Sequence, residues 1–181
     1  MTHRSWHGAV LATVFAWCLG QAAVAGGWVQ HQREPLNQLE IDQLRDAAQE
    51  PAARIKLFVQ FARTRLASLE QLRADPKVTD RAQQTHDKLQ EFLDIYDELN
   101  DNLDTFVERR ADLRKPLKEV IEADNEFQAK LQALRSASDT SKAEAAQYQF
   151  LLDNAVEAVD GGVQDHRQLL VEQEAAKHKK K

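Results

Sequence analysis

The sequence predicts an all-α fold, built from long helices that pack against one another through stripes of apolar residues. Apolar side chains recur at alternating steps of three and four along three long segments, the heptad spacing of helices that wrap around one another. Helix-capping patterns stand at segment starts, and no stretch shows the strict alternation of a half-buried strand. The expected architecture is an elongated antiparallel helical bundle, or coiled coil, of three long kinked helices.

Residues 1–25 are expected to form a secretory signal peptide. Arg4 supplies a positive charge, an uncharged apolar run covers residues 8–24, and small residues stand directly before Gly26 and two places earlier. A positive region, an apolar region and small residues at those two positions are typical of a cleavable export signal. We therefore expect cleavage between Ala25 and Gly26, and a periplasmic or secreted mature protein of the bacterial envelope.

Two alternatives remain for this apolar segment: an uncleaved N-terminal anchor, or a lipoprotein signal with its lipid on Cys18, the single cysteine of the chain. A membrane-spanning helix needs about 20 mainly apolar residues, whereas this run is shorter and contains two glycines and a glutamine. Trp17 precedes Cys18, where a lipoprotein signal has a small residue. Cleavage removes the cysteine, so no disulfide is expected in the mature protein.

The first helical segment begins at Asn37, an N-cap with Glu40 three residues further on, as in a capping box. It ends before Pro76, because a proline disfavours the helical conformation at the residue that precedes it. Pro51 lies inside this segment. A proline within a helix removes one backbone hydrogen bond and clashes with the preceding turn, so Pro51 predicts a kink.

The second segment is the longest and runs from about Asp80 to about residue 136. Its apolar stripe keeps one phase across Pro116, which favours a single helix kinked at Pro116 over two helices. The alternative is a turn there, which gives a compact four-helix up-down bundle. Arg110 and Asp124 are the two gaps in the stripe, whose apolar members are Leu89, Phe92, Tyr96, Leu99, Leu103, Phe106, Leu113, Leu117, Val120, Phe127, Leu131 and Leu134.

The third segment begins at Ser141, which has the capping-box spacing to Glu144. Its stripe includes Tyr148, Leu152, Val159, His166 and Leu169. Gly161 and Gly162 interrupt the segment, and each costs about 1 kcal/mol in a helix relative to alanine. The glycine pair therefore predicts a helix kink, or a point where another element packs closely.

The chain carries 29 acidic and 24 basic residues, for a formal net charge of −5. We expect a flexible N-terminal segment at 26–36, an acidic helical-bundle domain at 37–176, and a basic tail at 177–181. Nucleic-acid binding needs a basic face that displaces counterions, so no nucleic-acid partner is expected. Contact with a membrane is expected only if the signal stays uncleaved, or through the basic tail.

The candidate metal ligands are Asp94, Asp97, Glu98 and Asp101, which fall on neighbouring turns of the second segment. Calcium sites usually include backbone carbonyls from a loop, whereas a regular helix already engages its carbonyls. A solvated acidic helix face is the preferred interpretation, and no cofactor is expected. None of the histidines beyond residue 25 follows a glutamate by three residues, so the ligand pattern of di-iron bundles is missing.

His166 lies on the apolar stripe of the third segment. The preferred interpretation is a hydrogen-bonded histidine of the core or its boundary, and the alternative is a pH-sensitive element. Six phenylalanines are expected in the core rather than around a ligand: Phe58, Phe61, Phe92, Phe106, Phe127 and Phe150.

The sequence does not predict an enzyme, since it has no cysteine beyond Cys18, no nucleophile motif and few of the glycines that phosphate-binding loops require. The expected function is protein–protein contact by an envelope scaffold, adaptor or chaperone-like protein, with a protein partner or self-association through the heptad stripes. The alternative is an envelope sensor that binds a metal or a small ligand on its acidic helix face.

Overall fold

The computed structural model describes residues 35–137 and 140–178, and these residues form helices and no strands. The predicted all-α class is therefore confirmed. Arg33–Lys181 makes up one compact unit. The predictions for the signal peptide, including Cys18 and the cleavage between Ala25 and Gly26, lie outside the described residues.

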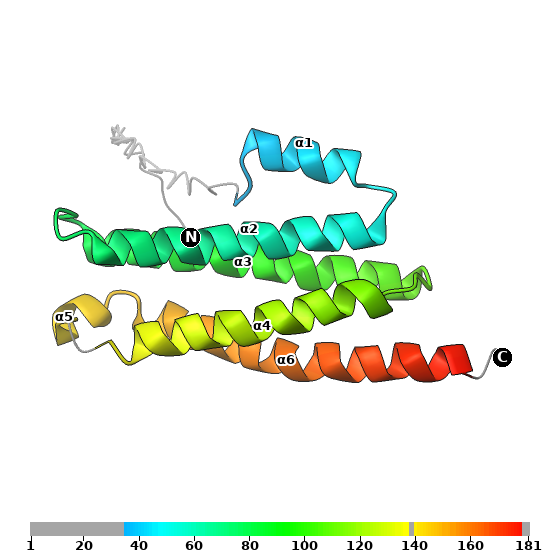
Figure 1. The fold of residues 1–181 in the computed structure, drawn as a ribbon. Coiled ribbons are helices and arrows are strands. Elements are labelled where there is room, and N and C mark those ends of the chain that lie inside the picture. Colours follow the sequence, from blue (N-terminus) through cyan, green and yellow to red (C-terminus); the bar gives the residue numbers. More distant parts are fainter. Residues whose placement is uncertain (1–34, 138–139, 179–181) are drawn as a thin grey trace, which may run out of the picture. The chain divides into compact units, whose positions relative to one another are not determined.

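The described residues form four long helices, α2, α3, α4 and α6, together with the shorter α1 and α5. The long helices lie side by side (Figure 1). Helix α2 forms an antiparallel hairpin with α3, and α4 forms a second one with α6. The two hairpins pack together through α2 against α4 and α3 against α6, and α1 lies along α2. The helices span Gln38–Asp46 (α1), Pro51–Ala74 (α2), Arg81–Glu108 (α3), Arg114–Arg135 (α4), Lys142–Ala145 (α5) and Gln149–His178 (α6).

The prediction of one continuous central helix is wrong, because α3 ends at Glu108 and the chain turns back before α4. Arg110 ends the helix with φ of 58°, the left-handed conformation that usually falls to glycine at this position. The Ala111 N–H donates to the Phe106 carbonyl, and the Arg110 N–H donates to the Val107 carbonyl. These bonds satisfy carbonyls at the end of α3, so four long helices replace the predicted three.

Both prolines that were expected to kink a helix lie in the first turn of one instead. Pro51 is the first residue of α2, and Pro116 is the third residue of α4. Backbone N–H groups in the first turn have no partner within the helix, so a proline there sacrifices no hydrogen bond. The apolar stripe keeps its phase across Pro116 because Phe106 and Leu117, on either side of the turn, both face the same core.

The predicted capping box at the start of α1 is confirmed. The Asn37 side chain accepts a hydrogen bond from the Glu40 N–H at 3.0 Å, and the Glu40 carboxylate accepts one from the Asn37 N–H at 2.9 Å. The same carboxylate pairs with Arg65 of α2 at 2.6 Å. Arg54 of α2 donates to the Leu44 carbonyl at the other end of α1. Two arginines therefore hold α1 against α2.

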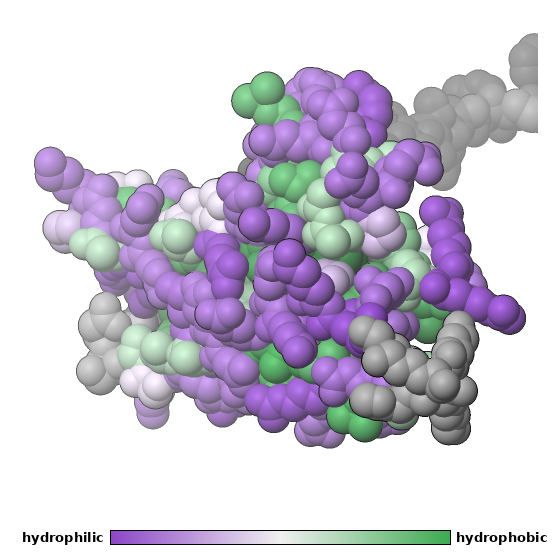
Figure 2. Space-filling model, turned by 45° about the vertical axis from the view of Figure 1, so that its right-hand side comes forward, coloured by the Kyte–Doolittle hydropathy of each residue, from purple (hydrophilic) through white to green (hydrophobic). Residues whose placement is uncertain are grey.

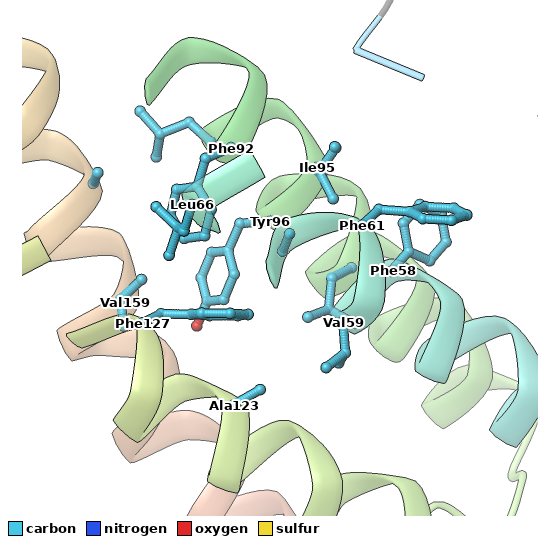
Figure 3. Packing of buried hydrophobic residues seen from close by; sticks show 14 of the residues in the cluster. Phe58, Val59, Phe61, Leu66, Phe92, Ile95, Tyr96, Ala123, Phe127 and Val159 are labelled. Atoms are coloured by element: carbon cyan, nitrogen blue, oxygen red, sulfur yellow. The ribbon is translucent and has the colours of Figure 1, made fainter. Parts of the chain in front are cut away.

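The apolar stripes of the four long helices meet in one core. Every member of the stripe predicted in the second segment is buried except Leu134, which is partly exposed. Five of the six phenylalanines are buried as predicted, and Figure 3 shows several of them around Tyr96. Phe150 is the exception at 79 % exposed, because it faces away from its buried neighbours Tyr148, Leu151 and Leu152.

Helix α6 runs through Gly161 and Gly162 without interruption. Ser141 caps a helix with its hydroxyl accepting from the Glu144 N–H, but that helix is the short α5, and the predicted third segment is interrupted before the long α6 begins at Gln149. The capping box predicted there is only half formed, because the Glu144 carboxylate binds arginines instead. The Glu144 carboxylate pairs with Arg73 at 3.0 Å and with Arg81 at 3.1 Å, which joins α5 to α2 and α3. Within the described residues, no helix is long and apolar enough to span a bilayer.

Candidate functional site

Four polar side chains meet in the middle of the apolar core, and we call them the core polar cluster: Tyr96 and Asn100 of α3, Asp124 of α4 and His166 of α6. Asp124 and Tyr96 are fully buried, and His166 is 5 % exposed. The cluster therefore links three of the four long helices at a depth where an unpaired polar group is costly.

Asp124 is the centre of this cluster. Its Oδ1 accepts the hydroxyl proton of Tyr96 at 2.9 Å, and its Oδ2 lies 2.8 Å from Nδ1 of His166. On the other side of the imidazole ring, Nε2 lies 3.1 Å from Oδ1 of Asn100. Each polar side chain of the cluster thus has a partner, as a buried network requires.

Both ring nitrogens of His166 face oxygen atoms, so the hydrogen bonds of the ring depend on which nitrogens carry a proton. The doubly protonated ring donates to Asp124 and to Asn100 at the same time. A neutral ring keeps both bonds only if the Asn100 amide rotates to present its NH2 group to Nε2. In either state the ring is held by two helices and has no free nitrogen.

The environment keeps Tyr96 protonated. Burial raises the pKa of its hydroxyl far above the usual value of 10.0, and the charges of Asp124, Asp165 and Asp97 raise it further. A protonated tyrosine is a hydrogen-bond donor, which is the role that Asp124 requires of it.

Gly162 makes room for this arrangement. A Cβ atom at Gly162 would lie only 2.0 Å from the hydroxyl oxygen of Tyr96. A Cβ at Gly161 meets nothing within 4 Å. Of the two readings of the glycine pair, the structure therefore supports close packing at Gly162, with the tyrosine side chain as the packed group.

Three aromatic rings surround the cluster on its apolar side (Figure 3). The Phe92 and Tyr96 rings are stacked, with centroids 5.8 Å apart. Phe127 meets both rings edge-on, at 5.4 Å from Phe92 and 6.2 Å from Tyr96. These contacts fix the orientation of the tyrosine ring, and the hydrogen bonds of the cluster hold three helices in register.

The structure does not bring the four candidate metal ligands together. Asp97, Glu98 and Asp101 are exposed on α3, and Asp94 accepts a hydrogen bond from Gln90 on the same helix. Partial burial of the Asp97 carboxyl and the charges of Asp94 and Asp101 raise its pKa. Across residues 35–137 and 140–178, no three acidic, histidine or cysteine side chains are grouped as a metal site.

A mainly apolar hollow lies between α2 and α4 and has a volume of about 240 Å³. Three charged side chains form its rim: Glu70, Arg73 and Lys130, the first and last of which pair at 2.7 Å. We call it the α2–α4 hollow; its apolar lining comprises Leu66, Leu69, Leu131, Ala133, Leu134 and Ala137. Figure 2 shows one face of the molecule, on which single hydrophobic residues are exposed between hydrophilic ones.

Comparison of the chain with protein-family models, with curated proteins and with solved structures finds no match.

Proposed function

We propose that this chain is a non-enzymatic helical-bundle protein of the bacterial envelope that acts through contact with a protein partner. The observation that carries the proposal is the α2–α4 hollow. An apolar centre with a charged rim is the usual composition of a protein–protein interface. The export signal predicted at residues 1–25 supplies the location.

The hollow suits one apolar side chain of a partner. Leu66, Leu69 and Leu131 form its floor and are already buried, while Ala133 is small and exposed at its edge. A side chain that enters there removes apolar surface from water without displacing a charged group. The Glu70–Lys130 pair beside the hollow offers both a hydrogen-bond donor and a hydrogen-bond acceptor to polar groups of the partner.

Self-association through the heptad stripes receives less support than a contact at this hollow. The stripe residues of α3 and α4 are buried in the chain's own core. A dimer that pairs stripes would have to open that core first, and this costs much of the folding free energy.

Site-specific cross-linking tests the proposal. In a Cys18→Ser background, Ala133→Cys places a photoactivatable label in the hollow, and Ala129→Cys places the same label one turn earlier on the exposed side of α4. We expect a discrete adduct with an envelope protein from position 133 and none from position 129. Equal labelling from both positions, or no adduct from either, contradicts the proposal.

A further inference from the structure

Helix α1 covers a face of α2 that lies beside the one turned toward the main core. Arg54, Phe58, Phe61 and Arg65 follow one another at steps of four, three and four, so they lie along one side of α2. Both arginines of this row bind α1, Arg65 near its start and Arg54 near its end. The two phenylalanines between them are buried and therefore lie along the line where α1 meets α2.

Helix α3 contributes to the same surface. Nε of Arg65 lies 3.4 Å from the Glu91 carboxylate, and Nε of Arg54 donates to the Asn102 side chain at 2.6 Å. Ile95 is one turn after Glu91 on α3 and is fully buried. Each arginine thus joins α1 to α3 as well as to its own helix.

We call this surface the α1 docking face, and it consists of an apolar floor between two arginines: Phe58, Phe61 and Ile95, with Arg54 and Arg65 at the ends. In the view of Figure 3, the three floor residues lie on one side of the hydrophobic cluster, and Phe127 and Val159 lie on the other. The docking face shares no residue with the lining of the α2–α4 hollow. It is therefore a second surface, distinct from the hollow.

Helix α1 is held on this face by few residues. Its buried side chains are Glu40 and Leu44, followed by Ala47 at the C-terminal cap. The Arg65 guanidinium donates to both carboxylate oxygens of Glu40, at 2.8 and 2.6 Å. Leu39, on the outer side of α1, is 75 % exposed. Isolated helices shorter than about 12 residues are marginal in water, so α1, which has nine, depends on these anchors.

The docking face keeps its polar partners when α1 leaves it. The Glu40 carboxylate then enters water, whereas Arg65 keeps Glu91 and Arg54 keeps Asn102. No buried charge is left unpaired, which is the large cost of breaking most buried ion pairs. The connection between α1 and α2 is exposed, so α1 leaves without disturbing the four long helices. The opening therefore costs mainly the exposure of the apolar floor.

We propose that α1 is a displaceable cover, and that the face beneath it binds an amphipathic helix of a partner protein. The required helix carries a carboxylate for Arg65 and a large apolar residue four positions later, because side chains at that spacing share one side of a helix. Glu40 and Leu44 are the example within this chain. A partner helix that is longer than α1 and has further apolar anchors buries enough surface to compete with the tethered segment.

An NMR titration of the full chain tests this inference, with a synthetic peptide of residues 35–47 as the probe. The anchor variant, Glu40→Ala with Leu44→Ala, removes both buried side chains of α1 and releases it. The peptide should shift the methyl signals of Ile95 in this variant, and should bind about tenfold more weakly to the unchanged chain, where the tethered α1 competes. The same peptide with Glu40→Lys should not bind, since it places a second cation against Arg65.

The matched control is Leu39→Ala with Asp46→Ala, which also removes one leucine and one carboxylate from α1, but from its exposed side. This control should behave as the unchanged chain. Equal peptide binding by the control and the anchor variant, or no shift of the Ile95 signals in the anchor variant, would overturn the inference. An anchor variant that no longer unfolds cooperatively would also overturn it, because α1 would then belong to the core.

Light scattering separates a second copy of this chain from a different partner. A dimer of the unchanged chain that the anchor variant fails to form would assign the docking face to the second copy and contradict the proposal. A protein contact at the α2–α4 hollow is scored separately by the cross-linking at Ala133, which does not depend on α1.

Discussion

Asp124 and His166 come from different helices, 42 residues apart in the sequence, and approach to 2.8 Å in the middle of the core. This contact forms because the chain turns back between α4 and α6, so that these two helices lie against each other, and the bond from Tyr96 to Asp124 forms because the chain also turns back between α3 and α4. The pair thus reports on the topology of the bundle as well as on its local packing.

Removal of either partner should destabilise the protein strongly. Asp124→Ala leaves His166 and Tyr96 without their acceptor, and breaking a buried pair in this way costs about 3–5 kcal/mol. His166→Ala should cost a comparable amount. Urea unfolding of both single variants and of the double variant measures the coupling between them. A coupling energy near zero would show that the two residues contribute independently.

Gly162→Ala should destabilise the bundle, although alanine favours helix formation. The new Cβ would overlap the Tyr96 hydroxyl, which is fixed by Asp124 and two aromatic rings. Gly161→Ala is the matched control, because its Cβ meets nothing and should gain about 1 kcal/mol from helix propensity. Thermal unfolding should therefore show a lower melting temperature for Gly162→Ala and a higher one for Gly161→Ala than for the unchanged protein. A stabilised Gly162→Ala variant would contradict the packing described here.

Tyr96 should make the protein sensitive to alkaline pH. Its pKa is raised in the folded state above the usual value of 10.0, so its contribution to stability is complete below pH 10.0 and falls as the pH rises beyond it. Tyr96→Phe loses about 1 kcal/mol at neutral pH with the hydrogen bond. The variant should also lose stability less steeply above about pH 10. Urea unfolding at several alkaline pH values measures both effects, and equal slopes in the two proteins would refute the assignment.

Glu40 should contribute to the acid sensitivity of the fold. Burial raises the pKa of its carboxyl, but hydrogen bonds from Arg65 and the Asn37 N–H, with the charge of Arg65, lower it by more. The folded pKa is thus below its usual 4.5, so the stabilisation is present above that pH and is lost as the pH falls through the folded value. Glu40→Gln should reduce stability at neutral pH by about 1–3 kcal/mol. Its unfolding should depend less on pH below about 4.5 than that of the unchanged protein.

The apolar pattern predicted the helical class and nearly all of the core, and the spacing of Asn37 and Glu40 predicted the α1 capping box. It did not distinguish a continuous helix from a turn at residues 109–113, because either arrangement directs the stripe toward an apolar surface. Two polar residues, Arg110 and Asp124, interrupt the apolar stripe, and at both of them the structure departs from a continuous heptad pattern. Arg110 ends α3 with a positive φ, and Asp124 is the buried partner of His166.

The core polar cluster was only partly predictable. His166 on the stripe indicated a hydrogen-bonded core histidine, which the structure confirms. Its partners Asp124 and Asn100 depend on how α3, α4 and α6 are placed in space, which periodicity along one helix does not contain. The sequence did contain one sign of the pairing. The stripe of the second segment is interrupted by an acidic residue, Asp124, and the stripe of the third segment contains a histidine, His166.

The most direct test of the account is a distance between α3 and α4. Spin labels at Gln83→Cys and Ala133→Cys, in a Cys18→Ser background, mark the start of α3 and the last turn of α4. The turn at residues 109–113 brings these positions to one end of the bundle, so a distance within roughly 30 Å is expected, given that α3 and α4 lie diagonally across a bundle whose neighbouring axes are roughly 10 Å apart. A single continuous helix would separate them by about 75 Å. A distance near that value would contradict the fold and, with it, the hydrogen bond between Tyr96 and Asp124.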